Sequence, residues 1–302
     1  MVDTDRSSLK HLVAHEKSIT LRDLRLQDIV PLGVCAALVI WLYVPVFNSW
    51  LAEWFKDESY YSHGVLVPFI SGFLVWLMRQ RLVNIPIRPD RWGYVILVLF
   101  LPVVPLMTWA GATIPQGLVF PIVVFGLSLV LLGREMTKQL WFPIAFLFFM
   151  CVLPGDILVK LSFRIQMLST AGAALVLKLL SLDASREGAV ISLPSITVQV
   201  GAPCSGFRLL ISLFAFSSLF AYLVEGPVWS RLALVGITLP LSLVLNVIRI
   251  TLIGLVGEFM GENAMHVFHD MAKFLIIIMA FIALWFIARW LKCQKFNSML
   301  LS

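Results

Sequence analysis

Long apolar runs separated by short polar connections make up most of the chain. The runs lie near residues 29–47, 64–78, 94–109, 117–132, 139–154, 206–224, 232–256 and 272–288. A helix needs about 20 apolar residues to cross a bilayer, and several of these runs are shorter than that. The pattern therefore predicts an all-α polytopic membrane protein, a bundle of about eight transmembrane helices, give or take one.

Residues 155–205 form a longer connection that begins with a different pattern. Asp156, Lys160 and Arg164 recur every four residues. Apolar side chains occupy the opposite positions, at Ile157, Leu161, Ile165 and Leu168. This spacing predicts a short amphipathic helix over 156–182 at the membrane interface. Its polar face either touches lipid headgroups only or helps to hold a substrate, and the sequence leaves both open.

The end of the same connection predicts β-structure. The stretches "AVISL" and "ITVQV" are rich in β-branched residues and flank Pro194 and Ser195. Two short strands joined by a turn, a β-hairpin segment, are the expected structure. The second strand leads the chain towards Cys204.

The composition agrees with a membrane protein. Of the 302 residues, 60% are hydrophobic and only 13% are charged, and the mean hydropathy is +0.94. A soluble domain has about 25% charged residues. The net charge is +6, from 23 Lys and Arg residues against 17 Asp and Glu residues.

The positive charge also predicts an orientation. If the N-terminus lies inside, most of the basic residues fall in inner loops, as is usual for short cytoplasmic loops. We therefore expect a plasma (inner) membrane protein with both termini in the cytoplasm. The predicted topology accounts for the excess of positive charge. The sequence contains no basic stripe with interleaved aromatic residues, so nucleic acid is not an expected partner.

These patterns divide the chain into three parts. Residues 1–28 are polar and do not match a cleavable signal, so we expect a cytoplasmic N-terminal segment. Residues 29–288 form one transmembrane domain, of which 155–205 is extracytoplasmic. Residues 289–302 form a cytoplasmic tail.

Three of the four cysteines have ordinary structural surroundings. Cys35 and Cys151 lie inside apolar runs, and Cys293 lies in the tail. The spacing of the four fits neither a zinc site nor a disulfide framework. We therefore expect no metal, no cofactor and no disulfide.

Cys204 differs because it directly precedes a predicted helix, within "APCSGFRLL". The helix begins near Ser205 or Gly206. Free backbone amides at a helix N-terminus favour the thiolate and so lower the pKa of a thiol. Arg208, one turn later, adds a positive charge. Cys204 is therefore a candidate nucleophile.

Two polar residues interrupt the run 232–256. Asn246 and Arg249 are three residues apart and share one helical face. A charge inside a span costs about 2.5–3.5 kcal/mol and usually faces the bundle interior or a wet cavity. The alternative is an arginine that reaches the headgroups or pairs with a carboxylate.

Histidines occur at the outer ends of two runs. His266, His269 and Asp270 precede the last run, and His63 follows two tyrosines at the start of the second. A single histidine at the membrane interface usually has no functional role. The tyrosines beside His63 are typical of an aromatic belt, with substrate docking as the alternative.

The predicted topology brings Cys204, Arg249 and the His266–His269 pair to the same outer side. Histidine transfers protons near neutral pH. A thiol beside histidine and arginine is suited to nucleophilic attack on a carbonyl group, with cationic groups to hold the oxyanion. The sequence alone thus predicts a membrane enzyme with a thiol site.

The motifs resemble those of the exosortase/archaeosortase family of membrane cysteine transpeptidases. The resemblance rests on "APCSGFRLL", "NVIRI", the "HD" before the last run, "YSHGVLVPFI" and the short basic loop after the second run, and on their order, spacing and shared side. It runs over roughly residues 54–288 and is most specific over 196–274. It implies cleavage of a C-terminal sorting signal of the PEP-CTERM kind on secreted proteins. The signal comprises a short Pro-Glu-Pro-like motif, a transmembrane helix and a basic tail.

The resemblance also implies roles for single residues. Cys204 falls on the nucleophile that forms an acyl-thioester, Arg249 on the proton donor and His269 on the transition-state stabiliser. Because arginine is too basic to give up a proton, we expect His269 to transfer the proton and Arg249 to hold the oxyanion. Lys273 stands where the family often has glycine, which leaves His266 as a rival for the third role.

The expected partners are secreted proteins with such a signal, the lipid bilayer and a surface acceptor such as an exopolysaccharide or a lipid. Supporting site candidates are Ser205, Gly206, Arg208, Asn246, His266, Asp270 and His63. Two alternatives remain. One is a non-enzymatic membrane component of exopolysaccharide export or assembly, and the other is an intramembrane protease that hydrolyses without transfer.

Overall fold

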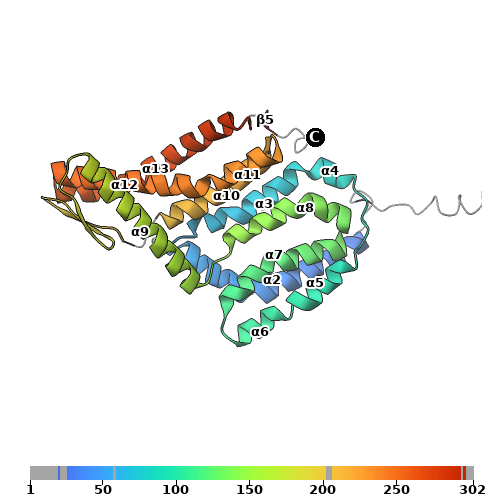
Figure 1. Cartoon of the computed structure of the whole chain (residues 1–302). Coiled ribbons are helices and arrows are strands. Elements are labelled where there is room, and N and C mark those ends of the chain that lie inside the picture. Colours follow the sequence, from blue (N-terminus) through green and yellow to red (C-terminus); the bar gives the residue numbers. More distant parts are fainter. Residues whose placement is uncertain (1–19, 21–25, 57–58, 202–205, 294, 297–302) are drawn as a thin grey trace, which may run out of the picture.

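The computed structural model describes residues 20, 26–56, 59–201, 206–293 and 295–296. They form a mostly helical bundle (Figure 1). The first part of the chain forms α2 (Leu26–Trp54), η2 (Ser62–Val65), α3 (Leu66–Leu77), α4 (Arg79–Val83), α5 (Trp92–Phe100), α6 (Val103–Trp109), α7 (Thr113–Leu131), α8 (Arg134–Phe146) and η3 (Leu147–Met150). The second part forms α9 (Gly155–Leu179), β1 (Ser185–Glu187), β2 (Val190–Ser192), β3 (Thr197–Gln199), α10 (Phe207–Leu223), β4 (Val224–Glu225), α11 (Val228–Gly236), α12 (Thr238–Met260), α13 (Glu262–Trp290) and β5 (Lys295–Phe296).

Among the described residues, five helices are long and apolar enough to cross a membrane. They are Gly33–Trp54, Trp92–Trp109, Ile114–Leu131, Val228–Met260 and Glu262–Trp290. A sixth is obtained if α8 with η3 and α9 count as one span, although they are bent by 83°. The predicted runs at 64–78 and 206–224 correspond to shorter apolar helices, Ser62–Leu77 and Phe207–Leu223. By length alone, the count falls below the predicted eight.

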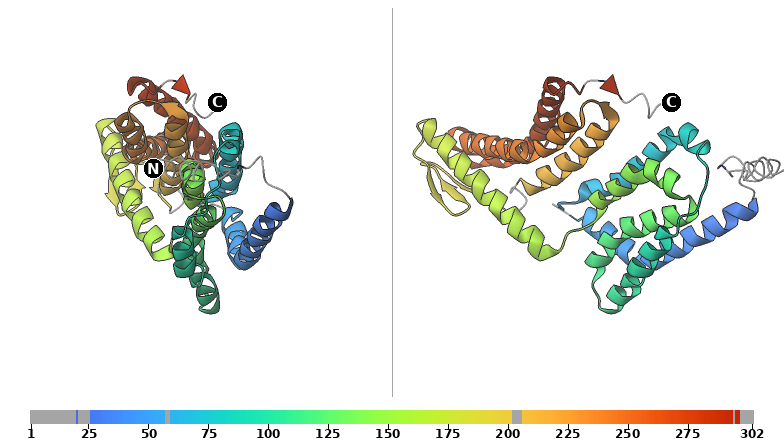
Figure 2. Two further views of the ribbon diagram at one scale, coloured as in Figure 1. Left: turned by 90° about the vertical axis from the view of Figure 1, so that its right-hand side faces the viewer. Right: turned by 45° about the vertical axis from the view of Figure 1, so that its right-hand side comes forward.

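The bundle has two distinct ends. Helix α4, the start of α2 and the end of α13 lie at one end, and the sheet and the junction of α12 with α13 lie at the other (Figure 1). Figure 2 shows α2 to α8 grouped on one side and α10 to α13 on the other, with α9 alongside α12 at the edge of the molecule. Segments distant in sequence therefore meet at the end that carries the sheet.

Helix α9 differs from its prediction in which side chains it buries. The predicted apolar face is divided, because Ile165 is buried while Ile157 and Leu161 stay exposed beside the charged residues. The buried face consists mainly of small or hydroxyl-bearing residues: Ser162, Ile165, Ser169, Thr170, Ala173, Ala174 and Leu177. Small side chains let helices approach closely. A methyl group on Gly172 would come within 2.7 Å of Val247 on α12.

Three short strands follow α9. The order in the sheet is β1-β2-β3, and both pairs are antiparallel. Strands β2 and β3 flank Pro194 and Ser195, where two strands were expected, and β1 is an additional strand on the far side of β2. The turn between β2 and β3 is fixed to α12, because the Ser195 amide and hydroxyl donate to the carboxylate of Glu258 at 3.1 and 3.0 Å.

Candidate active site

A cavity of about 290 Å³ opens among η2, α10, α12 and α13. Six of the predicted site residues line it: His63, Gly206, Arg208, Asn246, Arg249 and His269. They come from three segments that are far apart in the sequence. Because α12 and α13 form an antiparallel pair joined at Gly261, Arg249 and His269 face each other although they belong to different helices.

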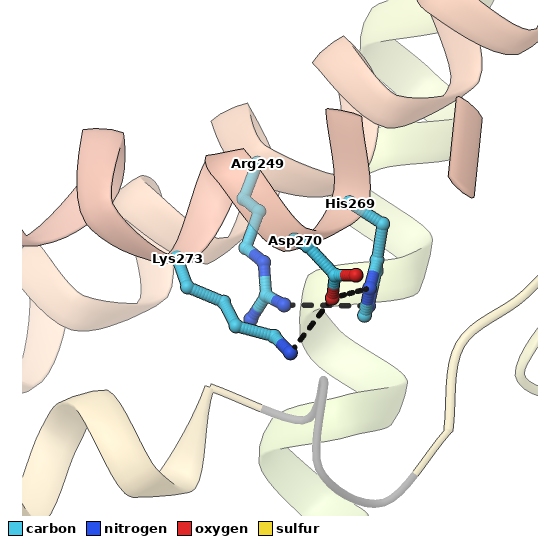
Figure 3. Close-up of polar contacts among 4 residues, drawn as sticks. All are labelled: Arg249, His269, Asp270 and Lys273. Carbon is cyan, nitrogen blue, oxygen red and sulfur yellow. Dashed lines mark hydrogen bonds and ion pairs between the residues drawn. The ribbon is translucent and has the colours of Figure 1, made fainter. Parts of the chain in front are cut away.

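Three of the lining residues, Arg249, His269 and Lys273, meet the exposed carboxylate of Asp270 (Figure 3). Nη2 of Arg249 lies 3.5 Å from Nε2 of His269, and Nδ1 of His269 lies 3.5 Å from the Asp270 carboxylate. A guanidinium can only donate, so the contact requires a lone pair on Nε2 and places the imidazole proton on Nδ1, towards Asp270. Lys273 pairs with the same carboxylate oxygen at 2.9 Å. The imidazole is thus held in one tautomer by its neighbours.

Gly206 has a conformation that other residues rarely adopt. Its φ angle is +83°, and a methyl group at this position would meet Cγ and Nδ2 of Asn246 at 2.8 Å. Both observations require glycine here. Asn246 is 1% exposed and packs directly against the start of α10. The polar pair in α12 therefore has two tasks, since Asn246 supports the start of α10 and Arg249 faces His269.

Arg208 brings a second guanidinium to the cavity. Its Nε and Nη2 atoms are buried and have no hydrogen-bond partner among the described residues. Buried polar atoms are usually paired, so such donors indicate a group that the site is built to bind. Lys273 also lines the cavity, and no described lining residue carries a carboxylate. The cavity is therefore suited to hold an anion or a developing negative charge.

His63 lines the cavity, and its ring contacts a hydroxyl group of α10. Its Nδ1 is 3.4 Å from the hydroxyl of Ser212. The tyrosines before it are not simple belt anchors, since Tyr61 is 2% exposed and accepts a hydrogen bond from the Leu153 amide. Burial raises the pKa of Tyr61 to about 12, so this hydroxyl stays neutral. Tyr60 contacts Ser162 of α9 at 3.2 Å and the ring of Phe207.

His266 is not at this cavity. Its side chain is 70% exposed and lies 3.8 Å from Glu262. It borders a second cavity of about 230 Å³, between β3 and helices α12 and α13, which His269 also lines. Histidines three residues apart share a helical face, yet this face is divided between two cavities with His269 at the boundary.

Some predicted residues cannot be placed and others were missed. Cys204 and Ser205 lie outside the described residues. Sequence reasoning overlooked Ser212, although it follows Arg208 by four residues and so shares its helical face. It noted Lys273 only as a departure from a family pattern. Within the described ranges, no group of three or more His, Cys, Asp or Glu side chains is arranged to hold a metal ion.

Comparison with protein families relates the chain to a known family. The model of the transmembrane exosortases (Exosortase_EpsH) matches residues 50–286, which include every residue that lines the cavity. The chain belongs to the transmembrane exosortase family. This confirms the resemblance that the motifs indicated. Exosortases are membrane proteins known as cysteine-type transpeptidases. Comparison with curated proteins and with solved structures finds no match.

Proposed function

We propose that this exosortase is a cysteine transpeptidase with Cys204 as its nucleophile. It cleaves a C-terminal, PEP-CTERM-like sorting signal from secreted proteins and transfers them to a surface acceptor. One observation carries the proposal: Arg249 and His269 meet at a cavity whose wall includes Gly206. Cys204 is two residues before Gly206. The chain therefore keeps their Cα atoms within about 7 Å of each other.

The lining residues suit the steps of acyl transfer. The thiol of Cys204 gives its proton to His269, and its sulfur bonds to the scissile carbonyl carbon, whose oxygen becomes negative. Arg249 and Arg208 stabilise this oxyanion. The C–N bond then breaks as the imidazolium protonates the leaving amine, which leaves a thioester. A nucleophile of the acceptor attacks the thioester carbon and gives its proton to the imidazole. The C–S bond breaks, and the Cys204 thiolate takes this proton back from the imidazolium, which restores the thiol.

The arrangement of basic residues supports an orientation. Arg79 and Arg81 at α4, Arg134 at the start of α8 and Arg289 near the end of α13 lie at one end of the bundle (Figure 1). The cavity lies towards the opposite end. By the positive-inside tendency, the α4 end is cytoplasmic and the cavity opens on the extracytoplasmic side of the plasma membrane. In this orientation η2 with α3, and α10, also cross the bilayer, which gives about eight spans.

A trapping assay tests the proposal. The chain is co-expressed with a secreted protein that carries a C-terminal Pro-Glu-Pro motif, a transmembrane helix and a basic tail. A thioester adduct between the chain and the cleaved protein is expected. Hydroxylamine should release this adduct, and Cys204→Ala should abolish it. Sequencing the new C-terminus of the product separates transfer from simple hydrolysis.

The cationic lining also favours a second candidate function, the binding of an anionic lipid or polymer during exopolysaccharide export. The two functions differ in their need for sulfur. Binding should survive Cys204→Ser and should depend on Arg208 and Arg249, whereas the transpeptidase should lose turnover in Cys204→Ser as fully as in Cys204→Ala. Repeated absence of the adduct across several signals, with normal insertion of the chain, would favour the binding function.

A further inference from the structure

The register of the small sheet shows which backbone groups β3 leaves unused. The Val200 amide donates to Ala189, and the Leu193 amide donates to Ile196. In an antiparallel pair, residues alternate between facing the partner strand and facing away. Ile196, Val198 and Val200 therefore turn their backbone groups towards β2. Thr197 and Gln199 turn their amides and carbonyls outward, away from the sheet.

This outward edge has no strand beside it. The order of the sheet is β1-β2-β3, which makes β3 an edge strand. No described backbone group pairs with Thr197 or Gln199 outside the pairing with β2. The side chains of both residues are exposed. An open edge of this kind is a template on which another extended chain can pair.

The edge lies next to the second cavity. That cavity, of about 230 Å³, is bounded by Val198 and Gln199 of β3, by Ile250 and Ile253 of α12, and by Met265 and His269 of α13. Its walls are mostly apolar side chains. His269 also lines the cavity that contains Arg249. A chain lying along β3 would therefore lead directly to the candidate active site.

The edge is also held firmly in place before anything binds. Val198 is buried and packs with Ile253 and Ala272. Glu258 fixes the turn before β3, and the side-chain amide of Gln166 donates to the Val200 carbonyl at the end of the strand. A preformed edge costs little conformational entropy when a peptide pairs with it.

We propose that the peptide substrate binds in an extended conformation as a fourth strand on the outer edge of β3. Its backbone pairs with the amides and carbonyls of Thr197 and Gln199. One apolar side chain enters the second cavity, and the following residues pass His269 to the scissile bond. The proposal rests on the proposed function for the nature of the ligand, and it adds how that ligand is held.

Binding to the full-length Cys204→Ala chain in lipid nanodiscs tests the inference without any need for turnover. The probe is a short fluorescent synthetic peptide with a central Pro-Glu-Pro motif, and each non-proline residue is N-methylated in turn. Alternate residues of an added strand point their amides at the edge. We expect weaker binding at every second position, by about fivefold for each hydrogen bond lost, and nearly unchanged binding at the positions between.

A matched pair of variants tests the edge from the side of the protein. Gln199→Pro removes an outward amide and leaves the pairing with β2 intact, since proline is tolerated on the open edge of a strand. It should weaken binding of the unmodified peptide by about fivefold. Gln199→Ala removes the same side chain but keeps the backbone amide, so it should weaken binding less than Gln199→Pro does. Equal effects of the two variants would contradict backbone pairing.

The outcomes separate this inference from the proposed function. Two results would contradict binding at the β3 edge without contradicting the transpeptidase. One is a loss of binding that does not alternate from one methylated residue to the next. The other is an absence of binding to Cys204→Ala when the wild-type chain forms the thioester adduct. A period of two in a chain that never forms the adduct supports the edge and counts against the transpeptidase.

Discussion

The two sides of the bundle treat buried polar groups differently. Between α2 and α8, polar side chains find partners inside the protein. The Trp54 indole donates to the Met150 carbonyl at 3.2 Å, Ser71 donates to the Pro143 carbonyl at 3.0 Å, and Cys151 lies 3.2 Å from the Gly117 carbonyl. The atoms left over there, on Tyr43 and Gln116, belong to neutral groups.

At the cavity between η2 and helices α10, α12 and α13, the buried atoms without a partner among the described residues include those of a charged group, beside Nε2 of His63. Two nitrogens of Arg208 are buried without a partner among the described residues. Leaving a charged group unpaired costs more than leaving a neutral one unpaired. The contrast teaches that the α2–α8 side is built for packing, whereas the cavity holds unpaired charged donors that a bound anionic group or a negatively charged transition state would satisfy.

The largest expected effect comes from exchanging one cysteine on each side. Cys204→Ala should lower transfer by at least about 1,000-fold, because no other group supplies the sulfur for the thioester. Cys151→Ala should leave turnover unchanged and should lower the free energy of unfolding by about 1 kcal/mol. Turnover and thermal unfolding of the two variants are measured side by side. Loss of turnover in Cys151→Ala but not in Cys204→Ala would contradict the assignment of Cys204 as the nucleophile.

Replacement of Arg249 should have the next largest effect on turnover. Arg249→Gln removes a charge that faces the oxyanion, and a loss of about 100- to 1,000-fold in kcat is expected. Arg249→Lys should recover only part of it, since an ammonium lacks the planar fork of donors. Arg289→Gln, near the other end of α13, is the control for charge removal. Initial rates of adduct formation give the comparison, and equal losses in Arg249→Gln and Arg289→Gln would count against a local role.

The two histidines of α13 sharpen the assignment of the cavity. His269→Ala should slow adduct formation by about 100-fold, the usual size for a lost general acid or base. At saturating substrate, His266→Ala should change it far less than His269→Ala does, because His266 does not line the cavity that contains Arg249. Single-turnover rates distinguish the two variants. The reverse order would make His266 the third catalytic residue.

The smallest effect is expected at Gly206, which packs against Asn246 at the start of α10. Gly206→Ala introduces a methyl group against Asn246 at a positive φ angle, which should lower stability by about 1–3 kcal/mol and activity by about tenfold. Gly155→Ala is the control, because nothing lies within 4 Å of the added methyl group. Thermal unfolding and adduct rates are both recorded. A fully active and stable Gly206→Ala variant would show that the start of α10 tolerates rearrangement.

The sequence predicts part of the arrangement at the cavity. The convergence of Arg249 and His269 follows from assigning both to the same side of the membrane, which the apolar runs and the basic loops determine. The pairing of Asn246 with Gly206 could not be predicted, because it depends on how closely α12 approaches α10. The same holds for His266, whose side chain faces the second cavity because β3 packs over that part of α13.

Helix α9 shows a second limit of the pattern. Its charges recur every four residues, as a helix at the interface requires, yet the protein buries the row that carries serines and alanines. Hydrophobicity scales do not report that small side chains promote close packing with α12. Strand β1 was missed for a related reason, since "SRE" is polar and becomes a strand only because β2 lies beside it.

Cross-linking tests most directly whether Cys204 faces this cavity. In a chain with Cys35, Cys151 and Cys293 replaced by alanine, His269→Cys or Ser212→Cys supplies a second thiol, and a short bifunctional thiol reagent is added in membranes. We expect an intramolecular cross-link to Cys204 in both variants, identified by mass spectrometry, and none with Trp290→Cys at the far end of α13. Failure of both cavity variants to cross-link, with Cys204 still open to a monofunctional reagent, would contradict the assignment of this cavity as the active site.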